Sequence, residues 1–165
     1  MEIQNTKHAA AGFTLSTAMG NLRITWSPRG ICSLDLGLPD SGGEAEAPAW
    51  VREAGRLITR HLAGDSVDLR SLPLDLEGLP AFHRRVYEAL RRTQPGETVT
   101  YGHLALLAGS PGAAQAVGQA LKRNPLPILV PCHRVLAANG LGGFSLLGGL
   151  KSKLLLLALE GVHPR

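Results

Sequence analysis

The chain has 165 residues, of which 44% are hydrophobic, so it can bury the core of one domain or of two small ones. Aromatic residues make up only 4%, too few to build the stacking platforms that bind single-stranded nucleic acid. The net charge of +4 is unevenly placed: residues 1–75 carry seven Lys and Arg against nine Asp and Glu, whereas residues 76–165 carry ten against four. A basic second half is typical of a protein whose partner has a phosphate backbone, although an unevenly charged, solvated surface explains it equally well.

Composition also bounds the location of the protein. The longest apolar run near the C-terminus, Leu154 to Leu159, is far too short to span a bilayer. Two cysteines, Cys32 and Cys132, and no apolar signal segment predict a reducing, cytoplasmic setting without a disulfide. No second Cys or His lies at zinc-ligand spacing from Cys132, so we expect no metal. We also expect no cofactor and no membrane association.

The first half of the chain is predicted to form short strands followed by one helix. Residues 12–36 alternate in part and contain the turn signal Ser27-Pro28-Arg29-Gly30, which indicates a β-hairpin or the start of a meander. The run Pro39 to Pro48 is rich in Gly, Ala, Ser and acids and is predicted to be a loop. Apolar residues at helical spacing then predict an amphipathic helix over 49–62.

The second half is predicted to be mainly helical. Residues 64–80 hold two glycines and two prolines, and we place there the boundary between an N-terminal domain, 1–75, and a C-terminal domain, 76–165. An apolar stripe predicts a helix over 81–92, and a short extended stretch follows at 98–101.

Two further short helices are predicted, over 101–108 and about 111–122. Ser110-Pro111 is a helix-start signal, a capping residue followed by proline at the first helical position. The pair resembles a helix-turn-helix, although an ordinary corner between two packed helices has the same pattern. The second helix is rich in Ala and Gly, and such a face can approach another backbone closely, including the walls of a DNA groove. Asn124-Pro125 ends it.

The apolar run 126–130 is predicted to be a buried strand, and it is followed by Pro131-Cys132-His133-Arg134-Val135. This pentapeptide places a thiol, an imidazole and a guanidinium side by side. A thiol is a strong nucleophile only as the thiolate, and a neighbouring base and positive charge favour that form. The segment therefore indicates an activated cysteine, although buried cysteines are commonly inert and a Cys-His pair also arises by chance.

From about Phe82 to Gly161 the chain resembles the O6-alkylguanine-DNA alkyltransferases, also called methylated-DNA–protein-cysteine methyltransferases. The resemblance rests on the order and spacing of several short motifs, since each alone is weak. They are GETVTY at 96–101, the helix-turn-helix, NP at 124–125, PCHRV at 131–135, GGFS at 142–145 and LALEG at 157–161. The first 75 residues fit the variable N-terminal domain of this family only loosely.

The resemblance implies an α/β fold with a small ribonuclease-H-like N-terminal domain and a mainly helical, winged-helix-like C-terminal domain. It implies a monomer that binds double-stranded DNA through the minor groove, flips an O6-alkylguanine out of the stack and transfers the alkyl group irreversibly to its own cysteine. Each molecule then acts once. Larger O6 adducts and O4-alkylthymine stay open as substrates.

Catalytic roles follow from the same resemblance. Cys132 is expected to be the nucleophile, and His133 to take its proton through a water molecule. Glu160 is expected to orient and charge-balance the imidazole; its residue pattern alone favours an exposed position ahead of a helix cap at Gly161. Asn124 matches the hinge asparagine that ties the recognition helix to the active-site turn, although a simple helix terminator is the alternative.

Binding roles are expected at two further sets of residues. Tyr101 corresponds to the tyrosine that presses on the target phosphate, and the second helix carries Gln115 where the family usually has an arginine that enters the base stack. The other DNA contacts are expected from His83, Gly102, Ser110 and Arg134. The substrate pocket is expected to include Pro131, the backbone of Val135, and Phe144 and Ser145, which would close over the alkyl group; Phe144 is otherwise an ordinary core aromatic.

The sequence departs from the family pattern in ways that affect these expectations. Glutamine brings no charge and a weaker stacking plane than arginine, so Gln115 predicts slower flipping or weaker affinity, for which Lys122, Arg123 or Arg134 would compensate through phosphate contacts. The loop 145–149 is about two residues longer than usual. Two alternatives to alkyl transfer are a non-catalytic sensor that binds the damaged base for another pathway, and a thiol hydrolase unrelated to DNA.

Overall fold

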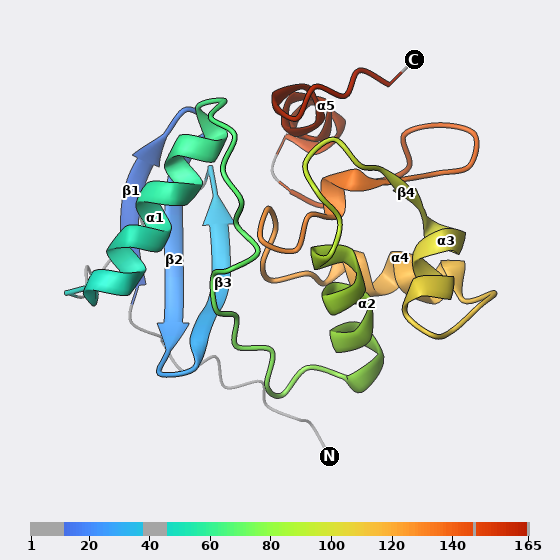
Figure 1. Cartoon of the computed structure of the whole chain (residues 1–165), viewed down its shortest axis with the longest axis horizontal. Coiled ribbons are helices and arrows are strands. Elements are labelled where there is room, and N and C mark those ends of the chain that lie inside the picture. The colour runs from blue at the N-terminus through green and yellow to red at the C-terminus, as the bar shows by residue number, and fades with distance from the viewer. Residues whose placement is uncertain (1–11, 38–45, 147, 165) are drawn as a thin grey trace.

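The two halves of the chain have different architectures. The computed structural model describes residues 12–37, 46–146 and 148–164. The first half forms a three-stranded sheet with one helix, and the second half is mostly helical, which together make a mixed α/β fold (Figure 1). Within these described ranges, no helix is long and apolar enough to cross a membrane.

The sheet is an antiparallel meander in the order β1 (Gly12–Thr17), β2 (Gly20–Ser27) and β3 (Gly30–Leu36), which confirms the meander over 12–36. Helix α1 (Ala49–Leu62) has the bounds predicted for it and packs against β1 and β2. Alternation buries Leu22 and Ile24 on one face of β2. Gly55 lets the helix approach, because a Cβ there would lie 3.3–3.4 Å from Leu15 and Ile24. Most of the loop expected over 39–48 lies outside the described residues.

The second half supplies the remaining elements. They are α2 (Ala81–Arg91), β4 (Val99–Thr100), α3 (Tyr101–Leu107), α4 (Ala114–Lys122), a 3-10 turn at Cys132–Arg134, β5 (Val135–Leu136) and α5 (Gly149–Leu159). Helices α2, α3 and α4 pack on one another, and β4 pairs with β5 in parallel. The helices predicted over 81–92 and 101–108 and the extended stretch at 98–101 are therefore confirmed.

Helix α4 begins three residues later than the sequence predicts. Gly112 has a φ of +84°, and the amide of Ala113 donates to the carbonyl of Ser110 (3.1 Å), so Ser110-Pro111 forms a turn before the helix. No side chain caps α4. The helix-start signal at Ser110-Pro111 is wrong because glycine at the following position favours the turn.

The apolar run 126–130 is a buried turn and not the strand that its composition predicts. The amide of Val130 donates to the carbonyl of Leu126 (2.8 Å), and Ile128 has a φ of +76°. Pro125 and Pro127 have no amide hydrogens, which removes donors that a strand would need. A β-branched residue in the left-handed region costs about 1–3 kcal/mol, which the surrounding core must offset.

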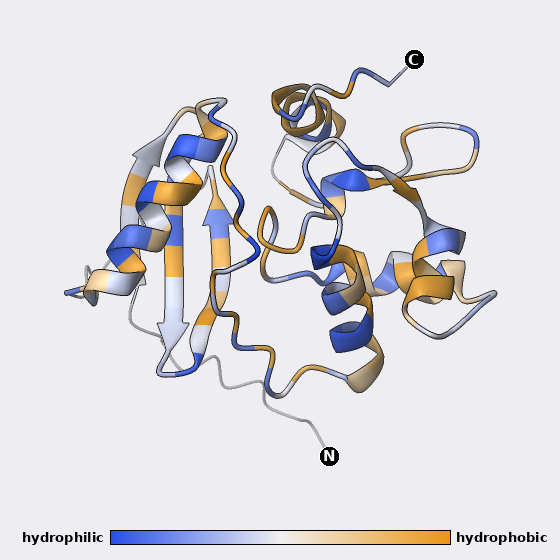
Figure 2. Cartoon of the chain, in the orientation of Figure 1, coloured by the Kyte–Doolittle hydropathy of each residue, from blue (hydrophilic) through white to orange (hydrophobic). Residues whose placement is uncertain are grey.

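Both halves share a single cluster of buried apolar residues, which runs from Leu22 in β2 to Leu156 in α5. Figure 2 shows that α5 is apolar along most of its length, whereas α1 and α2 alternate between apolar and hydrophilic residues. The sheet also bonds directly to the second half, because the amide of Leu34 in β3 donates to the carbonyl of Pro125 (2.9 Å). This contact holds the segment that leads into the 3-10 turn.

Candidate active site

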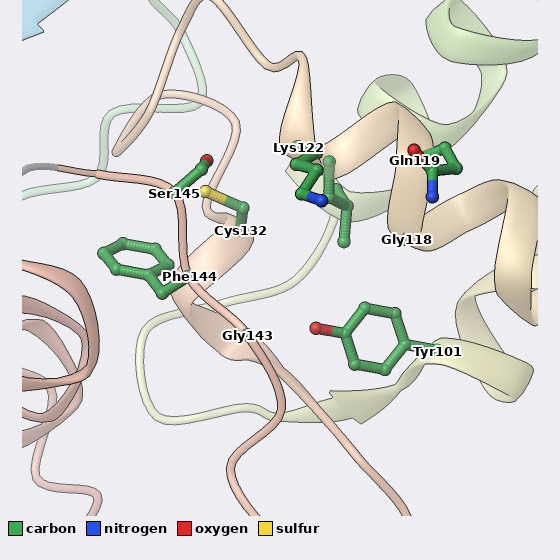
Figure 3. Close-up of a pocket in the computed structure, with 9 residues that line it drawn as sticks. Tyr101, Gly118, Gln119, Lys122, Cys132, Gly143, Phe144 and Ser145 are labelled. Carbon is green, nitrogen blue, oxygen red and sulfur yellow. The ribbon is translucent and has the colours of Figure 1, made fainter.

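Cys132 lies at one end of an open cavity of about 360 Å³. The residue begins the 3-10 turn and is only 7% exposed, so its thiol is reached through the cavity. Figure 3 shows the Cys132 sulfur, the hydroxyl of Tyr101 and the ring of Phe144 around this space. The cavity is lined by Tyr101, Gly118, Gln119, Leu121, Lys122, Cys132, Gly143, Phe144 and Ser145.

Glycine makes the tight fit at Tyr101 possible. Gly142 has a φ of +71°, and a Cβ at this position would lie 2.9 Å from two atoms of the Tyr101 ring and hydroxyl. The segment from Gly142 can therefore pass directly over the tyrosine and continue to Phe144 and Ser145, which line the cavity.

His133 is held by Glu160 in a buried hydrogen bond. His133 Nε2 lies 2.8 Å from Glu160 Oε1, and the two side chains are 1% and 0% exposed. Burial raises the pKa of Glu160, but hydrogen bonds from His133 and Arg134 outweigh it and bring the pKa to about 2. Glu160 is therefore ionised and can only accept, so Nε2 carries the proton. Glu160 is buried, against the exposed position that its local pattern favours.

The other ring nitrogen of His133 is consequently free to accept a proton. Burial lowers the pKa of His133 more strongly than Glu160 raises it, which keeps the imidazole neutral. A neutral imidazole protonated at Nε2 has its lone pair on Nδ1. Among the described residues His133 Nδ1 is buried and has no hydrogen-bond partner, so it offers a base next to Cys132.

Arg134 does not lie on a DNA-facing surface. Its guanidinium makes paired hydrogen bonds with the carboxylate of Glu160 (2.8–3.2 Å) and donates to the carbonyl of Thr93 (2.7 Å). The side chain is 7% exposed. The expectation that Arg134 contacts phosphate is wrong, because the buried carboxylate 26 residues later takes up its charge.

The thiol of Cys132 is not activated in the resting structure. Burial raises the pKa of this thiol, and the side chain of Asn124 and the charge of Lys153 lower it only in part. Activation of Cys132 therefore depends on His133 as the base and not on a lowered thiol pKa. The proton has to leave when the substrate arrives, and His133 Nδ1 is the base available for it.

Asn124 makes the hydrogen bonds expected of a hinge between α4 and the reactive turn. Its Nδ2 donates to the carbonyl of Val130 (3.0 Å), and its Oδ1 accepts from the amide of Leu126 (2.9 Å). These bonds satisfy the backbone of the turn around Ile128 and fix the start of the 3-10 turn relative to the end of α4.

Lys153 is part of the site and was missed by the sequence analysis. Its ammonium is fully buried and donates to the carbonyls of Val135 (2.6 Å), Leu141 (2.5 Å) and Gly143 (3.0 Å). Burial lowers the pKa of Lys153 to about 8. The signal was its position three and four residues before Leu156 and Leu157, which places a lysine on the buried stripe of α5.

Two residues expected in the pocket do not line it. Pro131 and Val135 are both buried, and neither borders the cavity that contains Cys132. The amide of Val135 donates to the carbonyl of Cys132, and its own carbonyl accepts from Lys153. The side chains of α4 that line the cavity, among them Gln119 and Lys122, had no such role in the sequence analysis.

The other residues expected to contact DNA spread over α2, α3, α4 and the turn between α3 and α4. Gly102 and Gln115 are exposed, and His83, Tyr101 and Ser110 are half-buried. Burial lowers the pKa of His83, and the charge of Arg123 lowers it further. Helix α4 thus presents Gln115 outward at one end and borders the Cys132 cavity at the other.

Comparison with known proteins gives a consistent result. Residues 81–162 match the family model described as 6-O-methylguanine DNA methyltransferase, DNA binding domain. A methylated-DNA–protein-cysteine methyltransferase from Methanosarcina acetivorans is 44% identical over 127 residues, which cover 75% of this chain and 76% of the relative. A DNA base-flipping protein from Thermus thermophilus is 43% identical over 150 residues, covering 89% and 97%.

A solved structure is similar over nearly the whole chain. The crystal structure of Mycobacterium tuberculosis OGT in complex with DNA superposes with a TM-score of 0.77 at 33% identity, and the match covers 92% of this chain and 93% of that one. The region matched by the family model, 81–162, contains the cavity residues, the His133–Glu160 pair and both packed helices α3 and α4. On these grounds the chain belongs to the methylated-DNA–protein-cysteine methyltransferase family.

Proposed function

We propose that this protein repairs duplex DNA by transferring the alkyl group of an O6-alkylguanine to the sulfur of Cys132. The observation that carries the proposal is a single buried thiol at an open cavity, next to a neutral imidazole whose Nδ1 is free. A bond forms between sulfur and the alkyl carbon, and the bond from that carbon to O6 breaks. The electron pair stays on guanine, which regains a proton.

The thiol proton is transferred first to His133 and then to guanine. It passes through a bridging water to His133 Nδ1, and Glu160 stabilises the imidazolium through the 2.8 Å hydrogen bond to Nε2. From the imidazolium the proton returns to the departing guanine. The product is a thioether, whose carbon–sulfur bond is not cleaved by water or by neutral side chains, so each molecule reacts once.

The lesion has to leave the base stack to reach Cys132. An O6-alkyl group lies inside the duplex, whereas Cys132 is buried and borders the cavity. Its volume of about 360 Å³ falls in the range of small-molecule sites, roughly 300–1,000 Å³. Helix α4 borders this cavity, and we assign to it the contact with the minor groove, with Gln115 at the gap that the base leaves and Tyr101 at the target phosphate.

The organisation of the whole molecule follows as part of the same proposal. We assign residues 1–75 to a ribonuclease-H-like domain and residues 76–165 to a winged-helix-like, DNA-binding and catalytic domain, in a cytoplasmic monomer. The supporting observations are the meander with one helix in the first half, the packed α3–α4 pair in the second, and the basic charge of residues 76–165.

Base flipping without alkyl transfer is the second candidate function. It is favoured by the similarity to the DNA base-flipping protein of Thermus thermophilus, which spans almost the whole of that relative. Cys132, with His133 Nδ1 free beside it, favours transfer instead, because binding alone needs neither a thiol nor a base.

Intact-protein mass spectrometry after mixing with a duplex that contains one O6-methylguanine tests both functions. We expect the wild type to gain the mass of one methylene group, Cys132→Ser to gain nothing, and the matched control Cys32→Ser to react like the wild type. A wild type that binds the modified duplex selectively but gains no mass would contradict transfer and support base flipping alone.

A further inference from the structure

A second histidine, from the first half of the chain, approaches the carboxylate that holds His133. His61 ends helix α1 and is 5% exposed. Its Nε2 lies 3.8 Å from Glu160 Oε1, the same oxygen that His133 Nε2 contacts at 2.8 Å. At 3.8 Å the two groups do not form a hydrogen bond, but charges at this distance interact strongly in a buried site. The family model, over 81–162, does not include His61.

The charges around Glu160 make a further proton in this cluster unfavourable. Glu160 and Arg134 cancel, so the cluster is neutral while both imidazoles are neutral. It becomes positive when His133 takes the proton of Cys132. A proton on His61 would add a second positive charge beside Glu160 Oε1 and weaken the hold of that oxygen on His133.

On the other side of His61, the one carboxylate among the described residues that line the adjoining cavity is already paired with an arginine. His61 lines a small cavity of about 20 Å³ whose charged residues are Asp68, Arg70, Arg91 and Arg134. Asp68 is paired with Arg70, and Arg134 with Glu160. Arg91 adds positive charge, with its Nε buried and without a partner among the described residues.

We propose that His61 limits alkyl transfer at acid pH, because a proton on its imidazole would draw Glu160 Oε1 away from His133. The first half of the chain thus affects how the rate of alkyl transfer depends on pH. Burial lowers the pKa of His61, Glu160 opposes this, and the charges of His133 and Arg134 lower it further, which agrees with a neutral imidazole at neutral pH. The inference rests on the alkyl transfer proposed above.

The pH dependence of His61→Gln tests the inference, because glutamine is polar and neutral at every pH. Single-turnover alkyl transfer is measured by mass spectrometry with saturating duplex. Near pH 8 we expect the variant and the wild type to react at similar rates. Towards about pH 5, where histidines titrate, we expect the variant to react about threefold or more faster than the wild type. The reason is that glutamine cannot take up the inactivating proton that His61 binds.

His163→Gln is the matched control, because His163 is an exposed histidine close to Glu160 in the sequence, and we expect it to follow the wild-type profile. A His61→Gln profile parallel to that of the wild type at all pH values would overturn the inference. An equal loss of rate at every pH, together with a lower melting temperature, would also overturn it and indicate a structural role alone. A wild type that gains no mass would instead overturn the proposed function.

Imidazole NMR gives a second test that does not depend on a His61 variant. In the wild type, His61 and His133 should titrate as a coupled pair. In His133→Gln the neighbouring charge is absent, so the pKa of His61 should rise. Independent titration, with the same pKa for His61 in both proteins, would contradict the inference even if the kinetic variants failed to fold.

Discussion

Glu160 joins groups that lie far apart in the sequence. It accepts from His133 and Arg134 in the 3-10 turn and from the amide of Gly96 (3.3 Å), and it faces His61 at the end of α1. Its carboxylate therefore fixes the proton acceptor and fastens α5 to the reactive turn. Removing this one charge leaves Arg134 buried and unpaired.

Glu160→Gln should lower the free energy of unfolding at neutral pH by about 3 kcal/mol. The pKa of Glu160 is about 2 in the folded protein and about 4.5 in an unfolded chain. The stability that it contributes is complete above the unfolded value and is lost as pH falls towards 2. Urea unfolding at a series of pH values measures this, and the variant should lose less stability on acidification than the wild type.

Glu88→Gln is the control for this comparison, because Glu88 is an exposed acid on α2. It should change the pH dependence of the unfolding free energy little, since exposed surface charges contribute little to stability. If the free energy of unfolding falls equally steeply between about pH 5 and 3 in the wild type and in Glu160→Gln, the Glu160 ion pair is not the cause of the loss of stability in acid.

At the scale of elements, α4 connects DNA recognition to the reactive cysteine. Gln115 lies exposed near its start, its second half borders the cavity, and Asn124 just after its end bonds to the turn that precedes Cys132. A change in how α4 meets DNA therefore acts close to the chemistry. Substitution at Gln115 separates the flipping step from the transfer step.

Gln115→Arg should speed transfer from duplex DNA about fivefold, because a guanidinium adds charge and a stacking plane worth about 1 kcal/mol. The free base O6-benzylguanine needs no flipping, so its rate should not change. Single-turnover rates on both substrates give the comparison, with Gln115→Ala as the variant expected to be slower on duplex alone. Equal acceleration on both substrates would place the effect in the cavity.

Periodicity predicted the elements well where one face of a helix or strand is buried. The bounds of α1 were predicted without error, and those of α2 and the meander nearly so, because their apolar residues repeat at the spacing of the structure. The prediction failed at the start of α4 and over 126–130, where Gly112 and prolines override composition.

Contacts within the site were harder to predict than its central residues. Cys132 and His133 stand next to each other in the sequence, and a resemblance was enough to identify them. Arg134, Lys153 and His61 take their positions from partners many residues away, and a side-chain pattern does not show which carboxylate or carbonyl a buried cation will meet.

At the scale of the whole molecule, the shared core predicts one cooperative unfolding transition. Both tryptophans, Trp26 and Trp50, lie in the first half, whereas Cys132 lies in the second. Tryptophan fluorescence and the reactivity of the Cys132 thiol, measured in Cys32→Ser, therefore report on different halves. We expect their urea transitions to coincide within error.

Separate midpoints for these two probes would mean that the halves unfold independently. The buried cluster from Leu22 to Leu156 and the hydrogen bond from Leu34 to Pro125 would then contribute little to joining them. Coincident transitions would agree with a first half that is required for the geometry around Glu160.

The pairing of Arg134 with Glu160 also affects how the protein holds DNA. Each phosphate that a protein cation neutralises releases condensed counterions and steepens the fall of affinity with salt by roughly 0.9 in logarithmic slope. Arg134 is paired with Glu160 inside the molecule, so it neutralises no phosphate and releases no counterions. The salt dependence of DNA binding is therefore set only by cations on the surface, such as the exposed Lys122 and Arg123.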